Sequence, residues 1–95
     1  MAGREMLTLF CYDIASDAAR RRVAATLERH GLRVQESVFE AKLAPARAEA
    51  LARTAARYLG PEDSLRVYAI GRGLRRHCLA FGPLGLSEEQ DFYLL

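Results

Sequence analysis

The order of two hydrophobic periodicities along the 95 residues constrains the fold more than any other feature. Residues 6–12 form an apolar run rich in strand-forming side chains, which is typical of a buried central strand. Apolar residues recur at helical spacing within residues 17–30 and again within 45–59. Strand-like patterns occupy residues 32–43 and 64–70. Strands and helices therefore alternate along the chain and are expected to share one small core.

Both predicted helices have recognisable ends. Ser16 or Asp17 caps the first helix, because a short side-chain oxygen accepts the unpaired N–H groups of the first turn, and Gly31 stops it. Pro45 opens the second helix, where its missing N–H costs nothing, and the Gly-Pro pair at 60–61 ends it. The apolar stripes consist of Ala19, Val23, Ala24 and Leu27 in the first helix, and of Ala48, Leu51, Ala52, Ala55 and Leu59 in the second.

The strand pattern places the chain in the α+β class. Residues 32–43 alternate imperfectly as one strand, and a bulge or bend near Gln35 and Glu36 would reconcile the two halves. Residues 64–70 alternate cleanly, and residues 74–81 predict a further short strand. If 32–43 is counted as a hairpin, the order is βαββαβ. That order suits a ferredoxin-like sandwich, with one antiparallel sheet and two helices on one face.

We expect a single domain over residues 1–95, in which residues 1–5 form an N-terminal extension. Residues 91–95 end in Phe-Tyr-Leu-Leu after an acidic connector and predict a C-terminal strand. A small sandwich has no obvious slot for this strand, and an exposed strand edge invites pairing. Adding it to the sheet of a second copy would cover the edge. The sequence therefore predicts a two-fold homodimer that exchanges the C-terminal strand.

Composition excludes several classes of protein. The chain is 51% hydrophobic and 27% charged, which is typical of a globular domain. No apolar run approaches the roughly 18 residues that a membrane span needs, and the N-terminus does not resemble a secretory signal. Two cysteines, Cys11 and Cys78, are too few for a disulfide scaffold and are expected to be buried small apolar residues. We therefore expect a cytoplasmic protein without membrane association.

Arginine dominates the positive charge. The net charge is +2, and all 14 basic residues except Lys42 are arginine. A genome rich in G and C accounts for this bias, although arginine is also the better bidentate phosphate ligand. The candidates for contacts to a nucleic-acid backbone are Arg20, Arg21, Arg22, Arg33, Arg72, Arg75 and Arg76. The alternative is that these side chains only form a solvent-exposed helix face and hairpin tip and bind no ligand.

Asp13 is the main candidate for chemistry. It follows the first strand directly and precedes a helix, a position that ligands favour in α/β sheets. Its carboxylate could hold a hard cation such as Mg²⁺, or it could be a helix cap or a turn residue. One carboxylate makes a poor magnesium site, but a two-fold dimer could bring two copies of Asp13 together.

Three residues of the second strand segment are weaker candidates. Ser37 has no evident His and Asp partners, which argues against a serine nucleophile. Phe39 is more often a core residue than a stacking platform, and Glu40 could be an exposed strand residue. The two histidines, His30 and His77, have no metal-ligand spacing.

Taken together, these residues resemble one family. The segments Tyr12-Asp13-Ile14, the arginine run at 20–22, the stretch 31–40 and the strand at 63–68 resemble the Cas-two family, the smaller of the two widespread CRISPR adaptation proteins. The similarity covers nearly the whole chain. It implies a ferredoxin-like homodimer that exchanges the C-terminal strand, and an assembly with the larger adaptation integrase that holds incoming spacer DNA.

The resemblance also implies roles for individual residues. Asp13 matches the family's strand-end aspartate, which binds a magnesium ion at the dimer interface and serves catalysis. Members are described as metal-dependent endonucleases of single-stranded RNA or, in some cases, of double-stranded DNA. Arg20 or Arg22, together with Arg33, Ser37 and Phe39, falls where the family keeps polar and aromatic site residues.

Two functions from different classes follow from this resemblance. In the first, the chain is a dimeric component of CRISPR spacer acquisition with Mg²⁺-dependent endonuclease activity. In the second, it is a non-catalytic scaffold that binds nucleic acid, and Asp13 is structural. A ferredoxin-like RNA-binding module is a weaker third alternative, because Phe10, Tyr12 and Tyr68 give only a partial set of strand aromatics.

Overall fold

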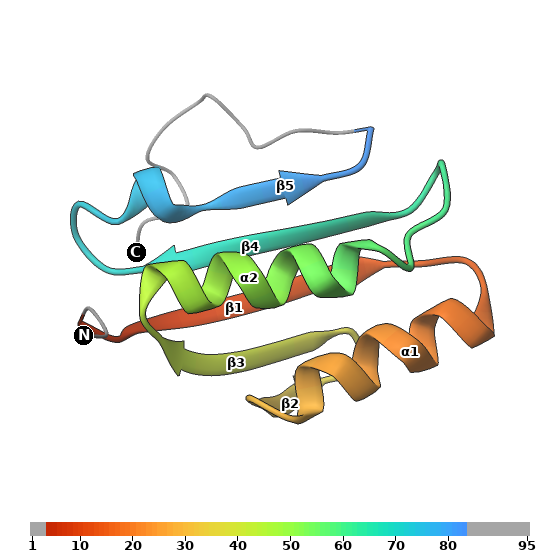
Figure 1. The fold of residues 1–95 in the computed structure, drawn as a ribbon, viewed down its shortest axis with the longest axis horizontal. Coiled ribbons are helices and arrows are strands. Elements are labelled where there is room, and N and C mark those ends of the chain that lie inside the picture. The colour runs from red at the N-terminus through yellow and green to blue at the C-terminus, as the bar shows by residue number, and fades with distance from the viewer. Residues whose placement is uncertain (1–3, 84–95) are drawn as a thin grey trace.

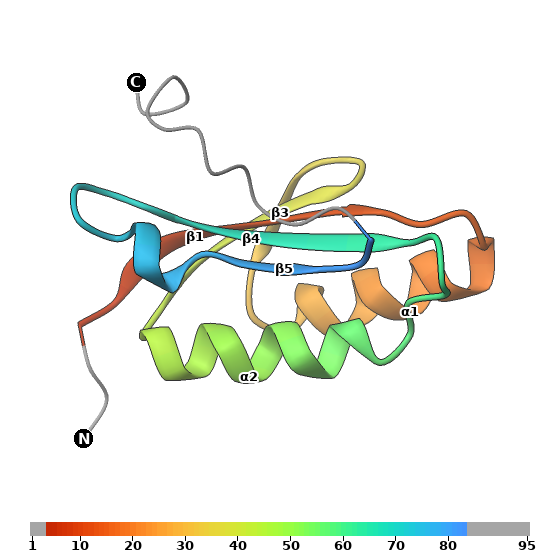
Figure 2. The same ribbon diagram turned by 90° about the horizontal axis from the view of Figure 1, so that it is seen from above.

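The computed structural model describes residues 4–83, which form one antiparallel sheet with two helices packed on one of its faces (Figures 1 and 2). The five strands lie in the order β2-β3-β1-β4-β5. Along the chain the elements are β1 (Met6–Asp13), α1 (Asp17–Glu28), β2 (Leu32–Gln35), β3 (Val38–Leu43), α2 (Pro45–Ala56), β4 (Ser64–Ile70), the 3₁₀ helix η1 (Arg75–His77) and β5 (Leu79–Phe81). The predicted α+β, ferredoxin-like fold is confirmed.

The segment 32–43 is a hairpin, so the interpretation as one bent strand is wrong. β2 and β3 pair antiparallel, with Leu32 opposite Glu40 and Gln35 opposite Val38. The pairing shifts between Arg33 and Gln35, close to the predicted bulge. The two halves of the segment alternate differently because they belong to two strands, which a turn at residues 36–37 separates.

The predicted strand at 74–81 is correct only in its second half. Residues 75–77 form the short helix η1, in which the N–H of His77 donates to the carbonyl of Leu74 at 2.9 Å. β5 then pairs with β4 from Leu79 onward. The preceding glycines Gly71 and Gly73 have φ angles of +147° and +77°, so the chain turns sharply before it can rejoin the sheet.

The core lies between the helices and one face of the sheet. On β1, Met6, Thr8, Phe10 and Tyr12 are buried, and the residues between them are partly exposed on the opposite face. The helix stripes predicted from the sequence supply the other wall: Val23, Ala24 and Leu27 from α1, and Ala48, Leu51, Ala52 and Ala55 from α2. The Ser16 hydroxyl accepts the N–H of Ala19 and caps α1 as expected.

The cysteines are only half-buried, in contrast to the prediction. Cys11 lies on the sheet face away from the helices, and Cys78 lies outside the sheet, directly before β5. Within the described residues, no helix is long and apolar enough to cross a membrane. The predicted C-terminal strand at 91–95 lies outside the described residues.

Candidate metal and nucleic-acid site

Asp13 ends the central strand β1 and is exposed. It lies opposite Ser64, the first residue of β4, and shares its sheet face with Cys11. No described helix covers this face (Figure 2). The structure therefore presents the carboxylate of Asp13 at a strand end where a ligand could reach it from solvent.

Two side chains fix the loop that follows Asp13. Arg20 donates through Nη1 to the carbonyl oxygens of Ile14 at 3.0 Å and Ala15 at 3.3 Å, and it pairs with Asp17. From the other side, Oδ1 of Asp63 accepts the N–H of Ala15 at 3.1 Å. The loop is therefore held by a guanidinium group on α1 and by a carboxylate before β4.

Sequence reasoning missed Asp63. Its side chain is buried, and its second oxygen, Oδ2, accepts the N–H of Gly60 at 2.7 Å. The available signal was an acidic residue that follows a Gly-Pro turn and directly precedes a strand. Asp63 thus joins the α2–β4 connection to the loop behind Asp13.

The three arginines at 20–22 point in different directions. Arg20 is directed to the Asp13 loop, which settles which of the three faces that loop. Arg21 and Arg22 are exposed, and the guanidinium carbon of Arg22 lies 6.0 Å from the centre of the Tyr58 ring. Arg21 and Arg22 are therefore the members of this run that are open to an outside ligand.

A second group gathers around Tyr12. The rings of Tyr12 and Phe39 stack with centroids 6.3 Å apart, and Arg33 lies 5.1 Å over the Phe39 ring. The N–H of Tyr12 donates to the carbonyl of Ser37 at 3.1 Å. Phe39 is fully buried, so it serves the core rather than a stacking platform in this chain. The structure thus brings Arg33, Ser37 and Phe39 together beside the end of β1.

Burial raises the pKa of the Tyr12 hydroxyl above its ordinary value. Arg33 and Arg20 lower this pKa, whereas Glu28 and Glu36 raise it. The hydroxyl donates to the carbonyl of Glu36 at 3.3 Å. Tyr12 therefore keeps its proton at neutral pH and donates a hydrogen bond to the turn between β2 and β3.

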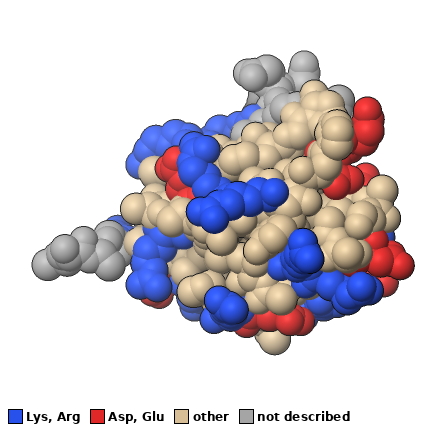
Figure 3. Space-filling view, turned by 45° about the vertical axis from the view of Figure 1, so that its right-hand side comes forward, with Lys and Arg blue, Asp and Glu red and all other residues tan. Residues whose placement is uncertain are grey.

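The remaining predicted arginines lie at the opposite end of the sheet. β4 begins beside Asp13 and ends with Ile70 beside Leu7, near the start of β1. Arg72, Arg75 and Arg76 follow β4, so about 20 Å of strand separates them from Asp13. Figure 3 shows that Lys and Arg side chains form several separate groups on the face it displays, with acidic residues near its edge.

The described part of one protomer does not offer a cluster of metal ligands. Among residues 4–83, no group of three or more His, Cys, Asp or Glu side chains is placed to hold a metal ion. Magnesium usually takes one or two carboxylates together with waters and substrate phosphates. Asp13 supplies one such carboxylate per protomer, and a second copy that brought its own Asp13 to the same place would supply the second.

Comparison with known proteins gives the same family from a family model and from individual relatives. The family model described as CRISPR associated protein Cas2 matches residues 6–77. A relative from Synechocystis named CRISPR-associated endoribonuclease Cas2 2 is 41% identical over 90 residues, which cover 92% of this chain and 96% of the relative.

Solved structures show the same similarity. The Cas2 protein of Streptococcus pyogenes, crystallised at pH 6.5, superposes with a TM-score of 0.63 at 29% identity, covering 84% of this chain and 100% of that protein. A chain of a partial Cas6-RT-Cas1–Cas2 complex superposes with a TM-score of 0.60 at 27% identity, covering 76% of this chain and 80% of that one.

Proposed function

Because the chain belongs to the Cas2 family of CRISPR-associated proteins, we propose that it acts in CRISPR adaptation as the dimeric, nucleic-acid-binding subunit of a complex with a larger integrase. The similarity to a chain of a complex that contains Cas1 and Cas2 supports this role. A nuclease activity centred on Asp13 is the finer part of the proposal. The observation that carries it is the exposed Asp13 carboxylate at the end of β1, on the sheet face that no described helix covers.

The same sheet face supports the dimer. Its side chains include Leu7 and Leu9 from β1, Val38 from β3 and Ile70 from β4, and Ile70 is 46% exposed. The same face also carries Glu40, Lys42 and Arg66, so it is mixed rather than purely apolar. Apolar side chains that are exposed together on such a face favour an interaction surface. A second copy that packs face to face would cover it and would bring two Asp13 residues to one interface.

Two Asp13 carboxylates would supply the number of acidic ligands that Mg²⁺ usually takes. When bound, the ion would lower the pKa of a water molecule and offset the charge of a phosphate. Arg20 and Asp63 hold the loop behind Asp13, so the carboxylate keeps its position. The exposed guanidinium groups of Arg21 and Arg22 could bind phosphates of the substrate backbone.

A purely architectural role is the second candidate. One acidic side chain per protomer makes a sparse active site, and no other metal-ligating cluster accompanies it in the described part of the chain. In this case the arginines neutralise phosphates, and Asp13 only ends the strand.

Cleavage assays separate the two candidates. Labelled single-stranded RNA and duplex DNA are incubated with and without Mg²⁺, with wild type, Asp13→Asn and the exposed-carboxylate control Glu62→Gln. Metal-dependent cleavage that is lost only in Asp13→Asn supports the nuclease. Absent cleavage, or equal cleavage by all three proteins, overturns the nuclease and leaves the architectural role.

A further inference from the structure

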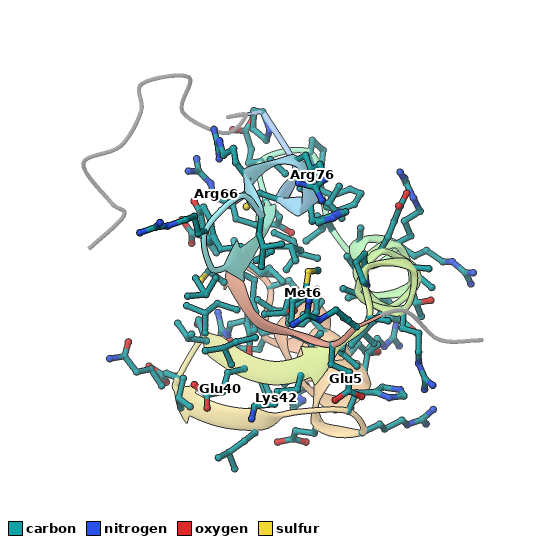
Figure 4. The ribbon with its side chains drawn as sticks, turned by 90° about the vertical axis from the view of Figure 1, so that its left-hand side faces the viewer. Glu5, Met6, Glu40, Lys42, Arg66 and Arg76 are labelled. Atoms are coloured by element: carbon teal, nitrogen blue, oxygen red, sulfur yellow. The ribbon has the colours of Figure 1, made fainter. Side chains whose placement is uncertain are left out.

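A second basic site lies at the end of the sheet remote from Asp13. Here a hollow of about 500 Å³ opens where β1 begins and the β4–β5 connection turns. Its polar lining comes from Arg4, Glu5, Arg72, Arg76 and His77, and Met6, Pro45 and Leu74 form its apolar part. Figure 4 looks at this end and shows Arg76 and Glu5 on either side of Met6, with Arg66 on the opposite side of the sheet.

The charges in this hollow are unbalanced. Three arginines and a histidine face a single carboxylate, Glu5. Within residues 4–83, Arg4 and Arg72 make no ion pair or side-chain hydrogen bond, in contrast to Arg20, Arg33 and Arg53. Like charges that outnumber their counter-charges repel one another, and a bound anion would relieve that repulsion.

Arg76 has a different part in this arrangement. Its guanidinium group donates to the carbonyl of Gly73, which follows Arg72 in the turn. Gly73 adopts a φ of +77°, a backbone conformation that residues other than glycine rarely take. Arg76 therefore braces the turn that carries Arg72, and Arg4 and Arg72 are left as the groups open to a ligand.

A smaller hollow with a basic lining lies on the other side of the first turn of α2. It measures about 270 Å³ and lies between the end of α1 and the side of α2 that runs from Arg47 to Thr54, and its charged lining is Arg29, His30 and Arg47 without an acidic residue. Pro45 lines the first hollow and Arg47 the second, so the two flank the first turn of α2. A series of cations on both sides of one turn suits a polymer of phosphates better than a single small anion.

We propose that the hollow formed by Arg4, Arg72 and His77 binds a backbone phosphate of a nucleic acid, and that the strand continues past the start of α2 toward Arg47. This inference rests on the proposed nucleic-acid-binding function and adds a contact site at the end of the sheet opposite Asp13. It gives the N-terminal residues before β1 a direct role in binding, through Arg4.

The test compares variants that lose the same charge. Binding of the full chain to labelled duplex DNA is measured by fluorescence anisotropy between about 50 and 200 mM salt. The variants are Arg4→Gln, Arg72→Gln and the control Arg57→Gln, which removes an exposed arginine that follows α2 and lines neither hollow. Circular dichroism confirms that each variant is folded.

Each phosphate contact contributes about 0.9 to the slope of log affinity against log salt on duplex DNA. Arg4→Gln and Arg72→Gln should each lower the slope by about one, so that wild type loses about threefold more affinity than either variant across this salt range. Arg57→Gln should keep the wild-type slope. A slope that is the same in all four proteins overturns the inference and leaves the proposed function intact.

Two further outcomes are informative. If wild type binds neither duplex DNA nor single-stranded RNA at any salt concentration, the proposed function itself fails. If inorganic phosphate binds to wild type but not to Arg72→Gln, while the affinity for DNA is equal in both, the hollow takes free phosphate and the assignment to a nucleic-acid backbone is wrong.

Discussion

Replacing Asp63 should weaken both the fold and the loop behind Asp13. Its carboxylate accepts two backbone N–H groups, from Ala15 at 3.1 Å and from Gly60 at 2.7 Å, and its side chain is only 7% exposed. A hydrogen bond to a charged group contributes about 1.5–3 kcal/mol to the free energy of unfolding. Ala15 and Gly60 are themselves exposed, so water can reach their N–H groups once the carboxylate is removed. We therefore expect Asp63→Ala to cost about 2–3 kcal/mol, at or just below the lower end of the sum of the two bonds.

The loss of stability in Asp63→Ala should appear as a fall in Tm of about 10–20 °C for a domain of this size. Asp63→Asn keeps one acceptor oxygen but sets an amide NH₂ against the other N–H, so its cost should be about half as large. Glu62→Gln changes the neighbouring exposed carboxylate and should stay within about 0.5 kcal/mol of wild type. Hydrogen exchange at the Ala15 amide should accelerate in Asp63→Ala, because this N–H loses its acceptor.

Urea unfolding and hydrogen exchange together test this reasoning. Equal unfolding midpoints for Asp63→Ala and Glu62→Gln would show that the two hydrogen bonds do not stabilise the fold. Unchanged exchange at Ala15 would show that Asp63 does not hold the loop. Either result refutes the role that the structure gives to this carboxylate.

Three other predictions concern different parts of the molecule. Gly31→Ala should cost about 1–3 kcal/mol in urea unfolding, because its Cβ would lie 2.7 Å from the carbonyl oxygen of Glu40; an unchanged midpoint would contradict this close approach. Burial raises the pKa of the Cys11 thiol above its ordinary value of 9.0 and Arg66 lowers it, so alkylation at pH 8 should be slower in the folded than in the unfolded chain and slower still in Arg66→Gln. The raised pKa also means that the contribution of Cys11 to stability is complete below pH 9 and falls as the pH rises above it. A thiol that is alkylated equally fast in the folded and the unfolded chain would rule out a raised pKa. Ile70→Asp should halve the mass measured by light scattering without unfolding the chain, since Ile70 lies outside the core, and an unchanged mass would count against a dimer through this sheet face.

Local sequence patterns were sufficient for the order of the elements. The period-two alternation of 64–70 and the helical stripes on α1 and α2 depend only on neighbours in sequence, and the structure confirms both. Caps and stops are also local, so Ser16 and Pro45 mark the helix starts correctly. The alternation pattern did not distinguish one bulged strand from a hairpin at residues 32–43, because a hairpin turn and a strand bulge both interrupt an alternating pattern.

The composition of the candidate site was only partly accessible from the sequence. Asp13 could be identified because its position depends on one strand end and one helix start. The sequence also singled out seven arginines, but it could not show that Arg20 is directed to the Asp13 loop while Arg72 lies at the far end of the sheet. That separation depends on the antiparallel pairing of β1 with β4.

Local patterns along the chain therefore sufficed for the class of fold, the buried faces of the helices and the strand end that carries Asp13. The tertiary structure decided which distant residues meet there. Asp63 reaches Ala15 across 48 positions of sequence, and Arg4 shares a hollow with Arg72 and His77. The physical reason is that side-chain neighbours across a sheet follow from strand order and register, and these are set by the packing of the whole core rather than by any local pattern.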